Sequence, residues 1–94
     1  MKTLVVYDIS DDGLRNKLAE LLKDLGFTRI QKSAFLGEVS EQERRDLEAR
    51  IMRLGLGEGD VVDIFPICER DLKVHSSVRR EGVSRGVPEA SHIG

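Results

Sequence analysis

Residues 1–25, MKTLVVYDISDDGLRNKLAELLKDL, contain the pattern that decides the fold of this chain. Residues 4–7 and Ile9 form a short run of β-prone side chains, which predicts a strand buried in the middle of a sheet rather than half-exposed. Asp8 interrupts this run. Because an unpaired carboxylate is costly to bury, Asp8 is expected to point to the end of the strand, to a partner or to a metal ion.

An amphipathic helix is predicted directly after this strand. Its apolar positions recur at helical spacing and share one face: Leu14, Leu18, Leu21, Leu22 and Leu25. Asp11 or Asp12 can cap its first turn, and Gly26 can end it. Capping accounts for both acidic residues without any chemical role.

The middle of the chain predicts a pair of strands and a second helix. Residues 28–39 (TRIQKSAFLGEV) indicate two short strands or one bent hairpin, with Gly37 at a kink or bulge. Ser40 and Glu43 match a capping box, which is typical of a helix start. Apolar residues at helical spacing follow this box, and Gly55 ends the pattern.

The last third of the chain predicts two further strands and a tail. Residues 61–68 (VVDIFPIC) form a strand that should lie at a sheet edge, because Pro66 cannot donate to a ladder. Apolar and polar residues then alternate through residues 72–78, which indicates a last strand with one wet face. From Gly82 onward the sequence has no apolar period, so this part is expected to lack regular structure unless a partner orders it.

The predicted order is strand, helix, strand, strand, helix, strand and one extra strand. This order is typical of an α+β, ferredoxin-like βαββαβ fold, with both helices on one face of an antiparallel sheet. We expect one domain over residues 1–80 and a flexible C-terminal tail over residues 81–94. The fold hosts several functions and therefore does not identify one. The sequence lacks the aromatic signature of RNA-binding modules and the paired cysteines of metal chaperones.

Composition narrows the class of protein. The 94 residues carry a formal net charge of −2, which argues against coating nucleic acid by bulk attraction but leaves room for a local basic face. A single cysteine, Cys68, cannot form an internal disulfide, and its apolar neighbours favour a core position. One cysteine and two distant histidines exclude a zinc site in practice. The apolar runs are too short for a membrane helix and no secretion signal is apparent, so a cytoplasmic location without membrane contact is expected.

Three stretches resemble one known family. VVYDIS (residues 5–10), LRNKLAELLKDLG (residues 14–26) and RIQKSAFLGEVS (residues 29–40) are similar to the CRISPR-associated Cas2 family, the small dimeric component of spacer acquisition in antiviral defence. The resemblance extends from about Leu4 to about Cys68. It implies a homodimer in which the two Asp8 carboxylates face each other across the two-fold axis.

The resemblance also implies a site and its partners. Asp8 corresponds to the metal-binding and catalytic carboxylate, and the cofactor would be Mg²⁺ or another divalent cation such as Mn²⁺. Other positions match residues that the family associates with nuclease activity or nucleic-acid contact: Tyr7, Arg15, Lys17, Arg29 and Phe35. The family is described as metal-dependent endonucleases on RNA or DNA. It is also described as a non-catalytic adaptor that holds spacer DNA between dimers of the partner integrase.

The residues themselves leave alternatives open. Asp8 could cap a turn or pair with an arginine instead of binding a metal. The chain could be a metal-dependent endonuclease, a DNA-binding adaptor that does not need Asp8, or a regulatory ferredoxin-like dimer that binds a small ligand. Nucleic-acid contact is expected from a few clustered basic residues, with these candidates: Arg15, Arg29, Arg79 and Arg80.

We interpret the chain as a dimeric spacer-acquisition protein with family-implied endonuclease activity. Its expected partners are a second copy, the CRISPR integrase, and DNA or single-stranded RNA. The four-stranded domain is complete at Cys68, so residues 71–79 are predicted to add to the sheet of the other protomer. That arrangement would bury Leu72, Val74 and Val78 at the dimer interface, and the tail beyond Gly82 would dock on the integrase.

Overall fold

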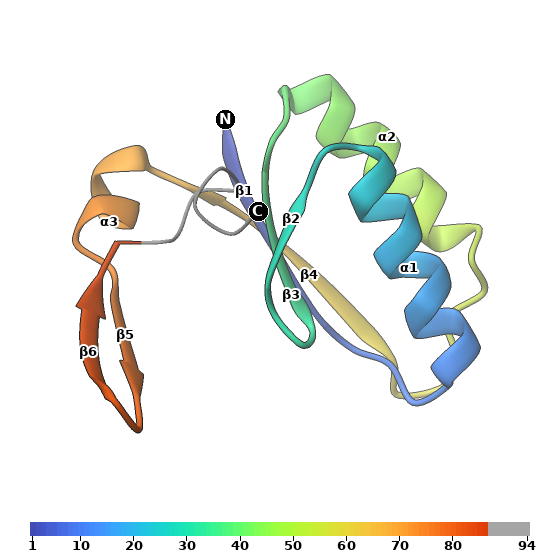
Figure 1. Cartoon of the computed structure of the whole chain (residues 1–94). Coiled ribbons are helices and arrows are strands. Elements are labelled where there is room, and N and C mark those ends of the chain that lie inside the picture. Colours follow the sequence, from blue (N-terminus) through green and yellow to red (C-terminus); the bar gives the residue numbers. More distant parts are fainter. Residues whose placement is uncertain (87–94) are drawn as a thin grey trace.

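The structure is a computed structural model that describes residues 1–86 (Figure 1). Along the chain its elements are β1 (Lys2–Asp8), α1 (Asp12–Asp24), β2 (Thr28–Gln31), β3 (Ala34–Glu38), α2 (Glu41–Met52), β4 (Val61–Ile67), α3 (Glu69–Lys73), β5 (Ser76–Arg79) and β6 (Gly82–Arg85). The first six elements follow the predicted βαββαβ order.

A four-stranded antiparallel sheet forms the centre of the molecule. Its strand order is β2-β3-β1-β4, so β1 is central and β4 lies at an edge, as Pro66 predicted. Both α1 and α2 cover the same face of this sheet (Figure 1). The predicted α+β, ferredoxin-like architecture is therefore confirmed.

The core lies between the helices and one face of the sheet. Thr3, Val5 and Tyr7 alternate along β1 toward this core and are buried, whereas Val6 and Asp8 point to the other face and are exposed. The prediction of a strand buried on both faces was wrong. Because both helices pack on the same side, the opposite face of the sheet, here called the open face, is not covered by a helix or a second sheet layer formed by residues 1–86.

Local sequence signals set the two long helices. The Asp11 carboxylate accepts a hydrogen bond from the Leu14 N–H at 2.8 Å and so caps α1. After α1, Gly26 takes a positive φ of 88°, which favours glycine at this helix end. At the start of α2, Ser40 and Glu43 exchange the two hydrogen bonds of a capping box.

Gly37 serves a different purpose from the one predicted. The register between β1 and β3 is regular through Gly37, so this residue marks no bulge. The irregularity in the sheet lies instead between Arg29 and Gln31 of β2. A Cβ atom at position 37 would stand 2.6 Å from the ring of Phe27, so glycine is required there by the close approach of an aromatic side chain.

The C-terminal part differs most from the prediction. Leu72 lies in the short helix α3, not in a strand, because residues 69–73 form one local helical turn. After it, β5 and β6 form a hairpin that is a separate two-stranded sheet. Residues 82–85, expected to begin a tail without regular structure, form β6. The rest of that tail, residues 87–94, lies outside the described residues, and the domain boundary at residue 80 stays a prediction.

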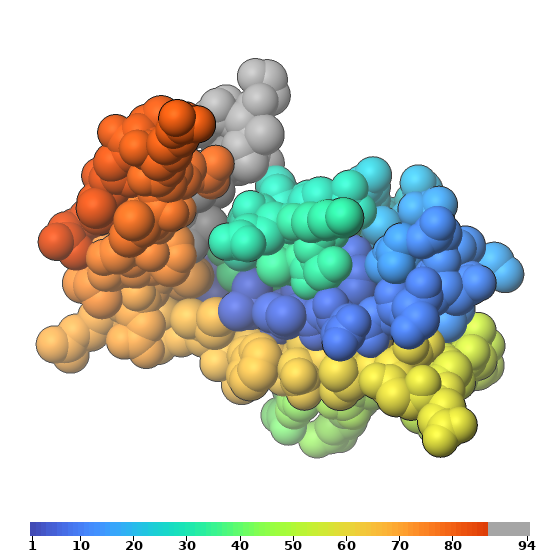
Figure 2. All heavy atoms as spheres, turned by 90° about the horizontal axis from the view of Figure 1, so that it is seen from below, coloured from blue at the N-terminus to red at the C-terminus, as the bar shows by residue number. Residues whose placement is uncertain are grey.

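The segment from α3 to β6, here called the C-terminal lobe, stands on the side of the sheet away from α1 and α2 (Figure 1). Figure 2 shows its orange and red surface beside the blue and teal surface of the four-stranded domain. Cys68, expected in the core, is exposed because β4 ends at Ile67 and the chain leaves the sheet there. Within residues 1–86, none of the helices is long and apolar enough to cross a membrane.

Candidate functional site

Asp8 is the last residue of β1 and lies opposite Val61 of β4. Its side chain is exposed on the open face. In the part of the chain that the structure describes, no hydrogen bond or ion pair involves the Asp8 carboxylate. Neither turn capping nor pairing with an arginine is therefore formed, and both carboxylate oxygens remain available as ligands.

A second carboxylate shares the open face with Asp8. Asp63 of β4 is paired with Val6 of β1, two residues before Asp8 on the same side of the strand. Such diagonal neighbours lie about 7–8 Å apart across an antiparallel pair. Sequence reasoning missed Asp63, although the alternation within residues 61–68 combined with the strand register could have revealed it.

Tyr7 and Phe35 belong to the core and not to the open face. Tyr7 is adjacent to Asp8 in sequence, but side chains alternate along a strand, so Tyr7 points toward the helices and is only 5% exposed. Its ring stacks on that of Phe35, with 6.3 Å between the ring centroids, and Phe35 is 0% exposed. Both aromatics can support the position of β1, but neither can touch a ligand from where it lies.

Arg15 is held by the loop that follows β1. Its Nη1 donates to the carbonyl oxygens of Ile9 at 2.9 Å and Ser10 at 3.3 Å, and its Nη2 pairs with Asp12. The guanidinium is therefore already hydrogen-bonded to the backbone of the two residues that follow Asp8. A direct phosphate contact by Arg15, which the sequence suggested, stays a prediction and would compete with these bonds.

Two further basic candidates occupy different surfaces. The guanidinium carbon of Arg29 lies 5.0 Å from the ring centroid of Phe35, a cation–π contact that positions an exposed charge at the edge strand β2. Lys17 is exposed on α1 and lines a hollow beside the loop after β1. Both remain candidates for nucleic-acid contact.

Arg79 and Arg80 lie elsewhere. Both are exposed at the turn of the β5–β6 hairpin, in the C-terminal lobe. The structure brings Asp8, Arg15 and Lys17 to the same end of the four-stranded domain. It does not bring Arg79 and Arg80 into that sheet, and their role stays a prediction.

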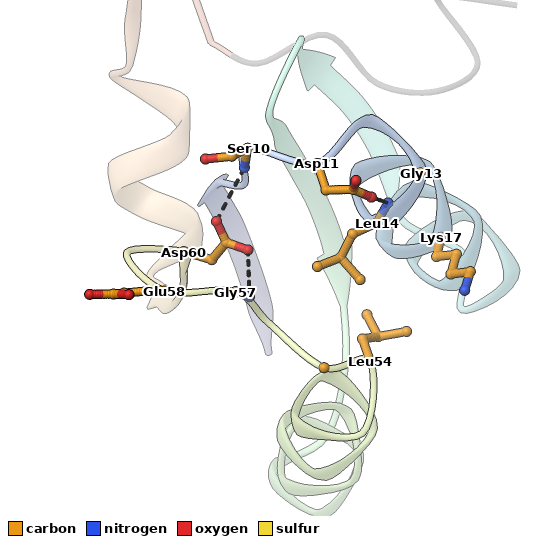
Figure 3. Close-up of a pocket in the computed structure, with 10 residues that line it drawn as sticks. Ser10, Asp11, Gly13, Leu14, Lys17, Leu54, Gly57, Glu58 and Asp60 are labelled. Atoms are coloured by element: carbon orange, nitrogen blue, oxygen red, sulfur yellow. Dashed lines mark hydrogen bonds between the residues drawn. The ribbon is translucent and has the colours of Figure 1, made fainter.

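Asp60 is a further candidate residue, which the sequence alone did not reveal. Its Oδ1 accepts a hydrogen bond from the Ser10 N–H at 3.1 Å, and its Oδ2 accepts one from the Gly57 N–H at 2.8 Å (Figure 3). Asp60 thus links the loop before β4 to the loop after β1. A hollow of about 400 Å³ lies along this junction, lined in part by Ser10, Lys17 and Glu58.

Metal ligands are sparse within one protomer. Among residues 1–86 there is no group of three or more His, Cys, Asp or Glu side chains that could hold a metal ion. The lone Asp8 carboxylate therefore suits a cation that keeps several waters, or a site completed by a second chain.

Comparison with known proteins gives the family. The family described as CRISPR associated protein Cas2 matches residues 1–74. "CRISPR-associated endoribonuclease Cas2" of Korarchaeum cryptofilum is 58% identical over 88 residues, which cover 94% of this chain and 95% of that protein. A "CRISPR-associated endonuclease Cas1/endonuclease Cas2 fusion" of Thermoproteus tenax is 33% identical over 72 residues, 77% of this chain and 27% of the fusion.

A solved structure shows the same fold. The crystal structure of Streptococcus pyogenes Cas2 superimposes with a TM-score of 0.65 at 23% identity, covering 73% of this chain and 88% of that one. The family match spans most of the chain, from β1 to just beyond α3. With the fold, the family match and a relative similar over nearly its whole length in agreement, this chain belongs to the Cas2 family of CRISPR-associated proteins.

Proposed function

We propose that this chain is a divalent-metal-dependent endoribonuclease that acts as a homodimer in the acquisition stage of CRISPR defence. The observation that carries the proposal is the Asp8 carboxylate, exposed at the end of a central strand and without a partner within residues 1–86. The names of similar proteins, which describe endoribonucleases, support RNA as the substrate.

The residues fit Mg²⁺ or Mn²⁺ as the cofactor. Mg²⁺ is usually held by one or two carboxylates together with several waters, so one Asp8 from each of two chains is a sufficient protein contribution. Two such carboxylates brought together would repel each other unless a cation relieved the repulsion. When bound, the metal lowers the pKa of a coordinated water and neutralises charge on the phosphate.

The open face supports a homodimer. Val61 and Phe65 of β4 expose 46% and 48% of their surface, and Val6 of β1 exposes 36% on the same face. Contiguous exposed apolar side chains of this kind mark interaction surfaces. A second copy packed on this face would cover them and bring the two Asp8 residues together.

The C-terminal lobe supports the same assembly. An isolated two-stranded hairpin is marginally stable in water, and among the described residues β5 and β6 pair only with each other. Val78 and Val83, which lie opposite each other in this hairpin, are 76% and 62% exposed. Addition of this segment to the sheet edge of the partner would bury both side chains. It would also supply hydrogen-bond partners for the N–H and C=O groups at that edge.

Association with a Cas1-type integrase is part of the proposal. It is supported by the Thermoproteus tenax relative, whose name joins Cas1 and Cas2 in one chain. Nucleic acid would be contacted by local basic residues such as Arg29, Arg79 and Arg80, because the whole chain carries a net charge of −2.

A second candidate function is a non-catalytic adaptor that binds spacer DNA. The sparse ligand set around Asp8 within one described protomer favours this candidate. An enzyme requires Asp8 for rate, whereas an adaptor requires its basic residues and tolerates the loss of Asp8.

The substitution Asp8→Ala separates these functions. We expect Mg²⁺-dependent cleavage of single-stranded RNA to fall by more than about 100-fold, because even residues that only support a metal ligand contribute about 10- to 100-fold. The matched control is Asp24→Ala, an exposed aspartate at the end of α1. Circular dichroism and sedimentation would verify the fold and the dimer of both variants.

Two results would redirect the interpretation. Unchanged cleavage by rigorously purified Asp8→Ala protein would remove Asp8 from the mechanism and point to a contaminating nuclease. Loss of cleavage with unchanged spacer integration, measured with the purified Cas1-type partner, would assign the physiological role to the adaptor.

A further inference from the structure

The ladder between β1 and β4 ends at the candidate metal ligand. The last registered pair is Asp8 with Val61, so continuing the register places Ile9 opposite Asp60. At this point a side chain replaces the backbone ladder, because the Ser10 N–H donates to the Asp60 carboxylate at 3.1 Å (Figure 3). Through Asp60, the chain that follows β1 thus stays bonded to the segment before β4 as far as Ser10, two residues beyond Asp8.

Asp60 is itself held in place by its own turn. Its backbone N–H donates to the Gly57 carbonyl oxygen at 3.1 Å, and its Oδ2 accepts from the Gly57 N–H at 2.8 Å. Gly59 takes a φ of 83° inside this turn, a conformation that side chains other than glycine rarely adopt. The turn therefore fixes the orientation of the carboxylate before it meets Ser10.

Arg15 holds the same loop from the other side. Its Nη1 donates to the carbonyl oxygens of Ile9 and Ser10, at 2.9 and 3.3 Å. In the loop after Asp8, the Ser10 N–H is thus bound by a carboxylate, and the carbonyl oxygens of Ile9 and Ser10 are bound by a guanidinium. Ile9 adds a third attachment, because its side chain is buried in the core.

We propose that Asp60 is a positioning residue for Asp8: it holds the loop after β1 so that the Asp8 carboxylate is presented in one fixed geometry to a divalent metal ion. This inference rests on the proposed function, in which Asp8 is the metal ligand. Both Asp60 oxygens accept backbone hydrogen bonds that turn the carboxylate toward the loop, and the proposal therefore gives Asp60 a positioning role and leaves the ligand role to Asp8. Supporting residues of this kind determine how well a ligand is preorganised.

The test is a titration of the full-length protein with Mn²⁺, in which electron paramagnetic resonance measures the concentration of free Mn²⁺ and so gives the affinity. We expect Asp60→Ala to weaken Mn²⁺ affinity by about 10-fold, the lower end of the usual effect of a residue that supports a metal ligand. Asp60→Asn keeps one carbonyl acceptor and should lose less affinity. Glu58→Ala is the matched control, because Glu58 lies in the same turn and makes no hydrogen bond among the described residues.

The two proposals fail in distinguishable ways. Wild-type Mn²⁺ affinity in Asp60→Ala, together with lost affinity in Asp8→Ala, would overturn the positioning role and leave Asp8 as the ligand. Wild-type Mn²⁺ affinity in Asp8→Ala would overturn the proposed metal site itself. A lower melting temperature in Asp60→Ala with unchanged Mn²⁺ affinity would show a purely structural role and would also overturn the inference.

Hydrogen exchange gives a readout that does not depend on metal. Asparagine leaves one oxygen acceptor for the two N–H groups that Asp60 binds, so in Asp60→Asn we expect the amide of Ser10 or of Gly57 to exchange at least several-fold faster than in the wild type, while the amides of β1 keep their protection. Should Asp60→Ala fail to fold, this variant decides the question. Unchanged exchange at both Ser10 and Gly57 would show that Asp60 does not hold the loop.

Discussion

Tyr7 and Asp8 are consecutive residues that serve opposite faces of one sheet. Tyr7 stacks on Phe35 beneath the helices, and Asp8 stands exposed on the open face. The alternation of side chains along β1 therefore places a carboxylate that has no partner among residues 1–86 one residue away from the core, without requiring its burial. Replacement of Tyr7 would act on Asp8 only through the position of the strand.

Gly37 offers a test of packing at the scale of one residue. We predict that Gly37→Ala lowers the free energy of unfolding by about 1–3 kcal/mol, because the new Cβ would stand 2.6 Å from the Phe27 ring. Urea unfolding would measure this change.

The Phe27→Leu background provides the control for that prediction. Leucine leaves space where the ring stood, so the double variant should lose less stability than the sum of the two single variants. A fully additive double variant, or a Gly37→Ala protein as stable as the wild type, would show that the ring does not impose glycine.

Some site residues were accessible from sequence and others were not. Asp8 could be identified from the sequence, because a carboxylate at the end of an apolar run is a local feature. Asp60 could not, because its partner Ser10 lies 50 positions away and only the register of β1 with β4 brings them together. The edge position of β2 also escaped prediction, although it lets the Arg29 guanidinium reach over Phe35 while remaining exposed.

Among the elements, α2 shows how a helix start responds to pH. The N–H of Ser40 donates to the Glu43 carboxylate at 2.8 Å, and this bond holds the pKa of Glu43 below its usual value. The charged form is favoured by folding, so its stabilisation is present above the pKa of the unfolded chain. It is lost as the pH falls through the lower pKa of the folded protein.

We predict that Glu43→Gln is less stable than the wild type at pH 7 and that the difference narrows as the pH falls below the usual range of carboxyl groups toward about pH 3. Glutamine retains an acceptor oxygen but cannot carry the charge. Thermal unfolding across this pH range would measure the convergence, with Glu58→Gln as a control outside the capping box. A constant difference from pH 7 to pH 3 would contradict the role of the charge.

The helices could be predicted more completely than the C-terminal elements. Caps and apolar spacing for α1 and α2 lie within a few residues of each other, so local signals sufficed. Between residues 69 and 85 the same local signals were ambiguous: alternation suggested one strand where the chain forms α3 and a hairpin. Such short elements depend on their surroundings more than on propensity.

At the scale of the whole molecule, the C-terminal lobe provides the test of assembly. The four-stranded sheet is complete at Ile67, so a chain that ends after Arg70 retains its folded core. We predict that the full chain sediments as the proposed dimer and that this truncation converts it to a monomer, because it removes β5 and β6. It should also remove the proposed metal-dependent cleavage, because the proposed site takes one Asp8 from each of two protomers.

Truncation after Gly86 is the matched control, since it retains both strands of the hairpin. This protein should sediment as a dimer. A stable dimer from the chain that ends at Arg70 would assign the subunit contact to the open face alone.

The central position of β1 also has a consequence for the order in which the molecule forms during synthesis. Of the strands in residues 1–86, β1 leaves the ribosome before the others, yet it pairs with β3 on one side and, from residue 61 onward, with β4 on the other. Pairs distant in sequence form late, because loop closure must precede them. Val61 and Asp60, which surround Asp8 in the folded protein, are therefore synthesised only after both long helices. The Asp8 carboxylate emerges early, but its surroundings form last.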